Sequence, residues 1–75
     1  DALLALDAGT TSTRALVFGG DGQVLGVAQR PLVARYPHPG WVEQDPDEML
    51  AAARAVGREA LAQAGHPTVV AAGIA

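Results

Sequence analysis

The alternation of apolar and polar stretches along the chain predicts a sheet before anything else. Apolar runs at residues 2–6, 13–19 and 23–30 are separated by clusters of glycine, aspartate, threonine and serine. Runs of this length between turn residues indicate β-strands, and Asp21-Gly22 is a typical hairpin sequence. The three segments therefore predict an antiparallel meander. Because the run at 2–6 is almost continuously apolar, we expect its strand to be buried on both faces.

The second half of the chain changes to helical spacing. Asp45 can cap a helix, Pro46 suits its first position, Gly65 can end it, and Pro67 prevents its continuation. Between these signals the apolar residues recur three or four positions apart: Met49, Leu50, Ala53, Val56, Ala60, Leu61 and Ala64. A last apolar run, residues 69–74, then predicts a strand that pairs in parallel through a right-handed connection. The predicted fold class is α/β, with a mixed sheet.

A loop is predicted between the third strand and the helix. Residues 31–44 contain three prolines and Gly40, which exclude regular structure. We expect Tyr36 and Trp41 to anchor this loop to the sheet, because isolated aromatic rings in such loops are usually buried. His38 has no second ligand nearby, so it makes a poor metal site and is expected to be a solvated loop side chain.

Composition and charge exclude several classes of function. The 75 residues carry a formal net charge of −3, and the five Lys and Arg do not cluster, so no nucleic-acid partner is expected. No apolar run is long enough for a membrane span. The absence of cysteine excludes disulfides and thiolate metal sites and fits a cytoplasmic protein. Because apolar runs lie at both ends, we expect the chain to be a truncated piece of a larger domain.

The stretch D-A-G-T-T-S-T-R, residues 7–14, carries the candidate chemistry. Gly9 lets the backbone approach a ligand closely, and Thr10, Thr11 and Ser12 supply hydroxyl donors for phosphate oxygens. The stretch contains neither a Walker A loop nor a dinucleotide fingerprint.

Two charged residues flank these donors. The Asp7 carboxylate could hold Mg²⁺, directly or through water, and the Arg14 guanidinium could offset phosphate charge. The same residue types also make ordinary hairpin turns. From these residues alone, a plain turn and a phosphate-binding loop explain the stretch about equally well.

Two segments together resemble a known family. D-A-G-T-T-S-T-R-A at 7–15 is similar to the D-x-G-T-[TS]-S-x-R pattern at the amino end of FGGY-type carbohydrate kinases. Y-P-H-P-G-W-V-E-Q-D-P at 36–46 resembles the Y-P-x-P-G-W-V-E-x-D-P stretch of that family, in the same order and at a matching distance. The amino-acid sequences of both segments are most similar to those of members that act on glycerol, although those members usually have glutamine where this chain has Ala8.

The resemblance implies a fold and a reaction. The fold would be the first β-β-β-α-β unit of a ribonuclease H-like, actin-like ATPase core. The reaction would transfer the ATP γ-phosphoryl group to a hydroxyl of glycerol or a related polyol or sugar. By position, Asp7 would lie near Mg²⁺, bound through water, and the backbone and hydroxyls of residues 9–12 would contact nucleotide phosphates, with Arg14 close by.

The resemblance also implies what this chain lacks. The residues that bind the polyol and the catalytic aspartate would lie beyond Ala75, so residues 1–75 would form only the amino-terminal part of the kinase's first domain and would be inactive alone. The parent kinase could be a homo-oligomer. The alternative from another class is a non-catalytic nucleotide-binding module of the actin-like superfamily, but such modules do not share the segment at 36–46.

Overall fold

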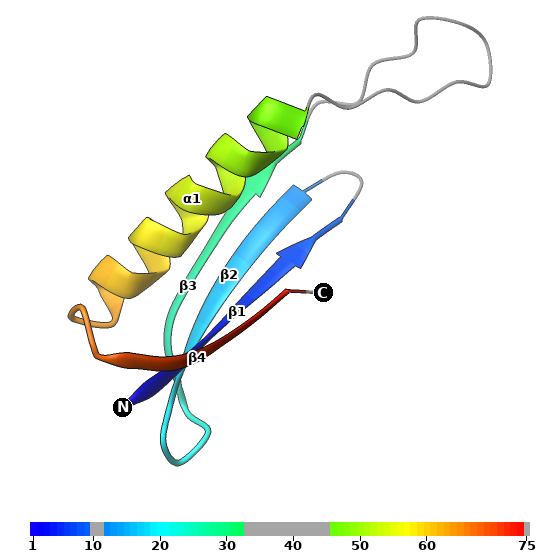
Figure 1. Ribbon diagram of the computed structural model, residues 1–75. Helices are drawn as coiled ribbons and strands as arrows, with labels where there is room; N and C mark the ends of the chain where they lie inside the picture. Colours follow the sequence, from blue (N-terminus) through cyan, green and yellow to red (C-terminus); the bar gives the residue numbers. More distant parts are fainter. Residues whose placement is uncertain (10–11, 33–45, 75) are drawn as a thin grey trace, which may run out of the picture.

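The computed structural model describes residues 1–9, 12–32 and 46–74 and shows one mixed sheet with one helix packed on it (Figure 1). The elements are β1 (Ala2–Ala8), β2 (Ser12–Gly19), β3 (Val24–Pro31), α1 (Pro46–Gln63) and β4 (Val69–Ile74). The strand order is β3-β2-β1-β4. Both pairs of the meander are antiparallel, and β4 pairs with β1 in parallel. The predicted mixed sheet is therefore confirmed.

Two strand boundaries differ from the prediction in ways that matter for the site. β1 continues through Ala8, beyond the apolar run at residues 2–6, so Asp7 and Ala8 are part of the strand. Pro31 is the last residue of β3 and not the first of the loop. Among the described residues β3 has a single neighbour, and an edge strand tolerates the missing proline N–H. The predicted cap Asp45 and the aromatic anchors lie outside the described residues.

The two ends of α1 follow the sequence signals. Pro46 is its first residue, as expected. At the other end Gly65 adopts a left-handed conformation with a φ of 82°. The His66 N–H donates to the Leu61 carbonyl at 2.8 Å, and the Gly65 N–H donates to the Ala62 carbonyl at 3.1 Å. This is the Schellman arrangement, and it confirms that Gly65 ends the helix.

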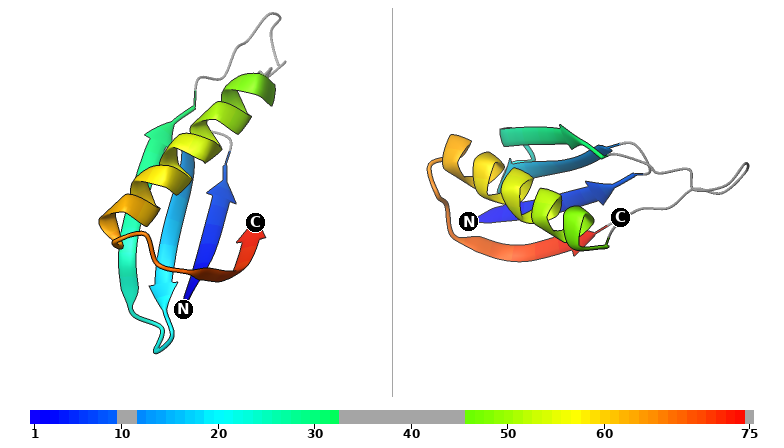
Figure 2. Two further views of the ribbon diagram at one scale, coloured as in Figure 1. Left: turned by 60° about the vertical axis from the view of Figure 1, so that its left-hand side comes forward. Right: turned by 90° about the horizontal axis from the view of Figure 1, so that it is seen from above.

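Small residues let α1 approach the sheet closely. The helix lies across one face, mainly over β2 and β3 (Figure 2). A side chain at Gly26 would collide with the Ala60 carbonyl oxygen, so only glycine fits beneath the helix there. The Gln63 side chain also accepts a hydrogen bond from the Val27 N–H at 3.1 Å. The buried core is small: Ala2, Ala15, Val17, Ala28, Val56 and Ala60.

The opposite face of the sheet has no second layer among the described residues. Leu3 is 47% exposed, and every residue of β4 is exposed. The expected burial of β1 on both faces is therefore not found in the described part of the chain. Burial on both faces needs cover on both sides, and α1 covers only one.

Candidate functional site

A backbone hydrogen bond joins the described residues on the two sides of the connection between β1 and β2. The Gly9 N–H donates to the Ser12 carbonyl at 2.9 Å, just beyond the strand pair formed by Ala8 and Thr13. A Cβ atom at Gly9 would lie 3.3 Å from the same Ser12 oxygen, which is tighter than ordinary side-chain contacts. Glycine therefore allows the close approach of Gly9 to the Ser12 carbonyl. Thr10 and Thr11, the other predicted phosphate ligands, lie outside the described residues.

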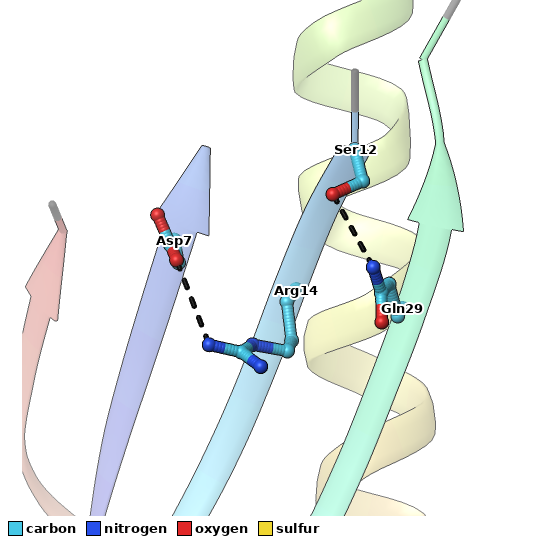
Figure 3. Close-up of polar contacts among 4 residues, drawn as sticks. All are labelled: Asp7, Ser12, Arg14 and Gln29. Atoms are coloured by element: carbon cyan, nitrogen blue, oxygen red, sulfur yellow. Dashed lines mark hydrogen bonds and ion pairs between the residues drawn. The ribbon is translucent and has the colours of Figure 1, made fainter. Parts of the chain in front are cut away.

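The two predicted charged residues face each other across the strands. The register pairs Asp7 directly with Arg14, and the Arg14 Nη2 lies 3.7 Å from the Asp7 Oδ2 (Figure 3). Both side chains are about half exposed, so solvent screens the pair and its contribution to stability is small. A long, exposed ion pair leaves the Asp7 carboxylate available to another cation.

Strand alternation places this pair on the face opposite α1. Ala15 and Val17 are fully buried in the core beneath the helix, whereas Arg14 lies between buried neighbours and is exposed. Since successive side chains on a strand point to opposite faces, Arg14 and its partner Asp7 belong to the uncovered face. The candidate site is therefore on the open side of the sheet, at the end where β1 stops and β2 starts.

A third strand contributes a side chain that the sequence analysis missed. Gln29 on β3 is the cross-strand partner of Arg14, so Asp7, Arg14 and Gln29 form one row across three strands. The Gln29 Nε2 donates a hydrogen bond to the Ser12 Oγ at 3.3 Å (Figure 3). The register of β2 and β3 shifts between Val17 and Phe18. Counting from the Asp21-Gly22 hairpin would therefore have placed Ala28 beside Arg14, so no local signal pointed to Gln29.

Thr13 lies between these residues in sequence but on the other face. Its side chain is fully buried, and its hydroxyl has no hydrogen-bond partner among the described residues. A buried hydroxyl without a partner costs about 1–3 kcal/mol. The structure thus separates Thr13 from the row, and brings Asp7, Gly9, Ser12 and Arg14 to one end of the sheet.

The donor set at this end suits a hard cation together with an anion. Among residues 1–9, 12–32 and 46–74 no group of three or more His, Cys, Asp or Glu side chains could hold a metal by itself. One carboxylate with waters and substrate phosphates is nevertheless how Mg²⁺ is commonly bound in phosphoryl-transfer sites. The backbone at Gly9, the Ser12 hydroxyl and the Arg14 guanidinium supply the complementary donors for an anion.

A family model matches almost the whole chain. Residues 2–75 match the model described as the FGGY family of carbohydrate kinases, N-terminal domain. Within the described ranges, no helix is long and apolar enough to cross a membrane.

Curated relatives point the same way. The chain is 59% identical over 63 residues to a glycerol kinase of Aromatoleum aromaticum, covering 84% of this chain and 13% of that protein. It is 51% identical over 74 residues to a glycerol kinase of Pseudomonas putida, covering 96% of this chain and 15% of that protein. The chain thus spans about one seventh of the length of these relatives.

Solved structures share the fold. A xylulose kinase from Rhodospirillum rubrum matches with a TM-score of 0.91 at 36% identity, over 99% of this chain and 16% of that chain. A gluconate kinase from Lactobacillus acidophilus matches with a TM-score of 0.87 over 99% of this chain and 15% of that chain. At 19% identity the second likeness concerns the fold alone. The expected actin-like β-β-β-α-β unit is confirmed.

Proposed function

The chain belongs to the FGGY family of carbohydrate kinases, and on this premise we propose that it forms part of the ATP site of such a kinase. The whole protein would transfer the γ-phosphoryl group of ATP to a hydroxyl of glycerol or a related polyol or sugar. Glycerol is the first acceptor to test, because the relatives named above are glycerol kinases. Residues 1–75 would be the amino-terminal part of the first domain.

One observation carries the proposal: the Asp7 carboxylate and the Arg14 guanidinium lie side by side, 3.7 Å apart, next to the Gly9–Ser12 turn. A plain hairpin needs neither charge on an exposed face beside its turn. Phosphoryl transfer from ATP needs both, since a carboxylate holds the cation and a guanidinium balances the phosphate oxygens. The pair is loose enough for each partner to turn to a ligand of its own.

The residues around the pair have separate tasks in this proposal. Gly9 keeps the turn small enough for backbone N–H groups to approach phosphate oxygens, and the hydroxyls of Thr10, Thr11 and Ser12 donate to them. Arg14 neutralises part of the charge that the transferred group carries. These contacts position and stabilise the phosphates and do not transfer a proton.

Asp7 fits a magnesium site of the kind this reaction uses. Its side chain is 56% exposed and has one charged neighbour at 3.7 Å among the described residues, so a hydrated cation can reach it. We assign Asp7 to Mg²⁺ through a water molecule, because Mg²⁺ gives up its waters reluctantly. When bound, the ion neutralises charge on the ATP phosphates. Asp7 would hold such an ion by accepting a hydrogen bond from one of its water ligands.

The proposal gives this segment a share of the site and not the whole of it. The polyol-binding residues and the general base belong to the rest of the kinase, so the 75 residues alone would not turn over substrate. A cytoplasmic location and assembly into homo-oligomers are further parts of the proposal. No observation favours the alternative of a non-catalytic module, since the matching family model is one of kinases.

The test is ADP release by the full-length protein with Mg²⁺-ATP and a panel of acceptors: glycerol, other polyols, ketoses and aldoses. Release with glycerol alone would support the proposed acceptor and would show that Ala8 is compatible with it. Release with a different sugar would keep the reaction and change the acceptor. No release with any of them, from protein that is folded, would overturn the kinase proposal.

A further inference from the structure

Gln29 is close to the candidate site in space but far from it in sequence. It lies on β3, 17 residues beyond Ser12, and takes no part in the stretch that marks the turn. The register sets it directly beside Arg14, on the side away from Asp7. Across the three strands, the Asp7 carboxylate, the Arg14 guanidinium and the Gln29 carboxamide therefore lie in one row.

The direction of its hydrogen bond decides what Gln29 can do. The Nε2 amide donates to the Ser12 Oγ at 3.3 Å, so one lone pair of the hydroxyl is occupied. A serine hydroxyl has two lone pairs and a single proton. Because Gln29 occupies a lone pair and leaves the proton free, the Ser12 hydroxyl is available as a donor. A phosphate oxygen accepts hydrogen bonds and needs such a donor.

The neutrality of the Gln29 side chain also matters. Arg14 pairs with Asp7 on one side and has the uncharged carboxamide on the other. A carboxylate in the place of Gln29 would compete with Asp7 for the guanidinium. It would also accept the Ser12 proton, which leaves no donor for the phosphate. The structure thus gives two reasons why an amide, and not an acid, suits this position.

We propose that Gln29 is a positioning residue of the nucleotide site, which holds the Ser12 hydroxyl as a donor towards phosphate and places no second carboxylate beside Arg14. This inference rests on the proposed function. It adds to that function a residue on a third strand, which acts through Ser12 and does not touch the nucleotide.

The test compares two glutamines changed in the same way in the full-length protein. Gln29→Glu removes a donor, because the amide of Gln29 donates to Ser12. Gln63→Glu is the matched control, because the Oε1 of Gln63 accepts from the Val27 N–H and a carboxylate can still do so. Each variant adds one negative charge to the surface. The readout is the dissociation constant of the Mg²⁺ complex of β,γ-imido-ATP, measured by calorimetry without any acceptor.

We expect Gln29→Glu to weaken nucleotide binding about tenfold, the usual effect of losing one hydrogen bond to a charged group. Gln63→Glu should bind as the unchanged protein does. Unchanged nucleotide binding in Gln29→Glu would overturn the inference and leave the proposed function in place. No binding by the unchanged protein would overturn the proposed function itself.

A double-mutant cycle separates action through Ser12 from a general effect of charge. Gln29→Met keeps the length of the side chain, adds no charge and should weaken binding about threefold. Combined with Ser12→Ala, the same change should have no further effect, because the group it acts on is gone. An undiminished effect of Gln29→Met in the Ser12→Ala protein would refute positioning through Ser12. The KM of the acceptor should stay the same in every variant.

Discussion

The connections at the two ends of β2 use similar residues for different purposes. The turn after β2 is closed from within: the Gly19 N–H donates to the Gln23 carbonyl at 2.8 Å, and the Asp21 carboxylate accepts from the Gln23 N–H at 3.3 Å. Before β2, the acid is Asp7, which lies in β1 and faces the Arg14 guanidinium instead of closing a turn. One acid completes its own turn, whereas the other remains available to a ligand.

The glycines of the two turns, Gly9 and Gly22, are also required for different reasons. Gly22 has a φ of 85°, a conformation that side chains other than glycine rarely adopt, and a Cβ atom there would meet nothing within 4 Å. Gly9 is not among the glycines with a positive φ, but a Cβ atom there would press against the Ser12 oxygen. Glycine is therefore required at position 22 by the backbone conformation, and at position 9 by the lack of room for a side chain beside the Ser12 carbonyl. Composition alone cannot distinguish these two uses.

The largest expected effect separates the two acids. Asp7→Asn in the full-length kinase should lower kcat about 10- to 100-fold, as is typical when a residue that orients a metal-bound water is lost. The measurement is ADP release across a range of Mg²⁺ concentrations, where the variant should need more Mg²⁺. Asp21→Asn is the matched control and should retain full activity. Full activity of Asp7→Asn would contradict the comparison, because Asp7 would then have no more part in the reaction than Asp21.

The next effect concerns stability and falls on the other turn. Gly22→Ala should destabilise the β2–β3 hairpin by about 1–2 kcal/mol, because alanine must adopt a left-handed backbone conformation. Hydrogen exchange of the β2 and β3 amides measures this local change in the full-length protein. Nucleotide affinity should not change. An unaltered exchange rate would show that the turn relaxes to a conformation that alanine accepts.

A smaller effect is expected at the corresponding glycine of the first turn. Gly9→Ala should weaken nucleotide binding about fivefold, since a slight shift of the turn weakens about one hydrogen bond. Calorimetry with the Mg²⁺ complex of β,γ-imido-ATP measures it, and hydrogen exchange of β1 and β2 should stay close to that of the unchanged protein. A loss of protection in these strands with no loss of affinity would make Gly9 a structural glycine like Gly22.

The smallest effect is expected at the acid that closes its own turn. Asp21→Ala removes one exposed hydrogen bond to the Gln23 N–H, which is worth about 0.5 kcal/mol. Hydrogen exchange of the Gln23 amide and ADP release together check this expectation. A clear loss of activity would mean that the second turn also serves the reaction.

The sequence predicted the fold where local signals and packing agree. Pro46 and Gly65 mark the ends of α1, and Asp21-Gly22 marks the hairpin that aligns β2 with β3. The two-sided burial of β1 was wrong for the described residues, because its apolar run does not reveal which residues would provide the second layer. Local patterns predict how a strand pairs more reliably than what covers it.

Local patterns also limited the prediction of the candidate site, which included the residues of the first turn but not the residue on β3. Asp7 and Arg14 stood out because one motif of eight residues contains both, and the pairing of β1 with β2 then sets them side by side. Gln29 did not stand out, because the register that places it beside Arg14 is shifted by an irregularity between Val17 and Phe18. Gly26 was missed as well: a glycine within a strand indicates a close approach, but its partner, the Ala60 carbonyl, comes from a distant helix.

The hydrogen bond from the Val27 N–H to Gln63 has a consequence for how the sheet can grow. An edge strand with unpaired N–H groups invites pairing with another chain. On β3 that tendency is reduced, because Gln63 occupies one donor, Pro31 lacks another, and an irregularity interrupts the pairing beside Gly26. β4 at the other edge is apolar and exposed along its whole length. Among the described residues, strand addition is thus hindered along β3, whereas β4 leaves the opposite edge of the sheet open to a further strand.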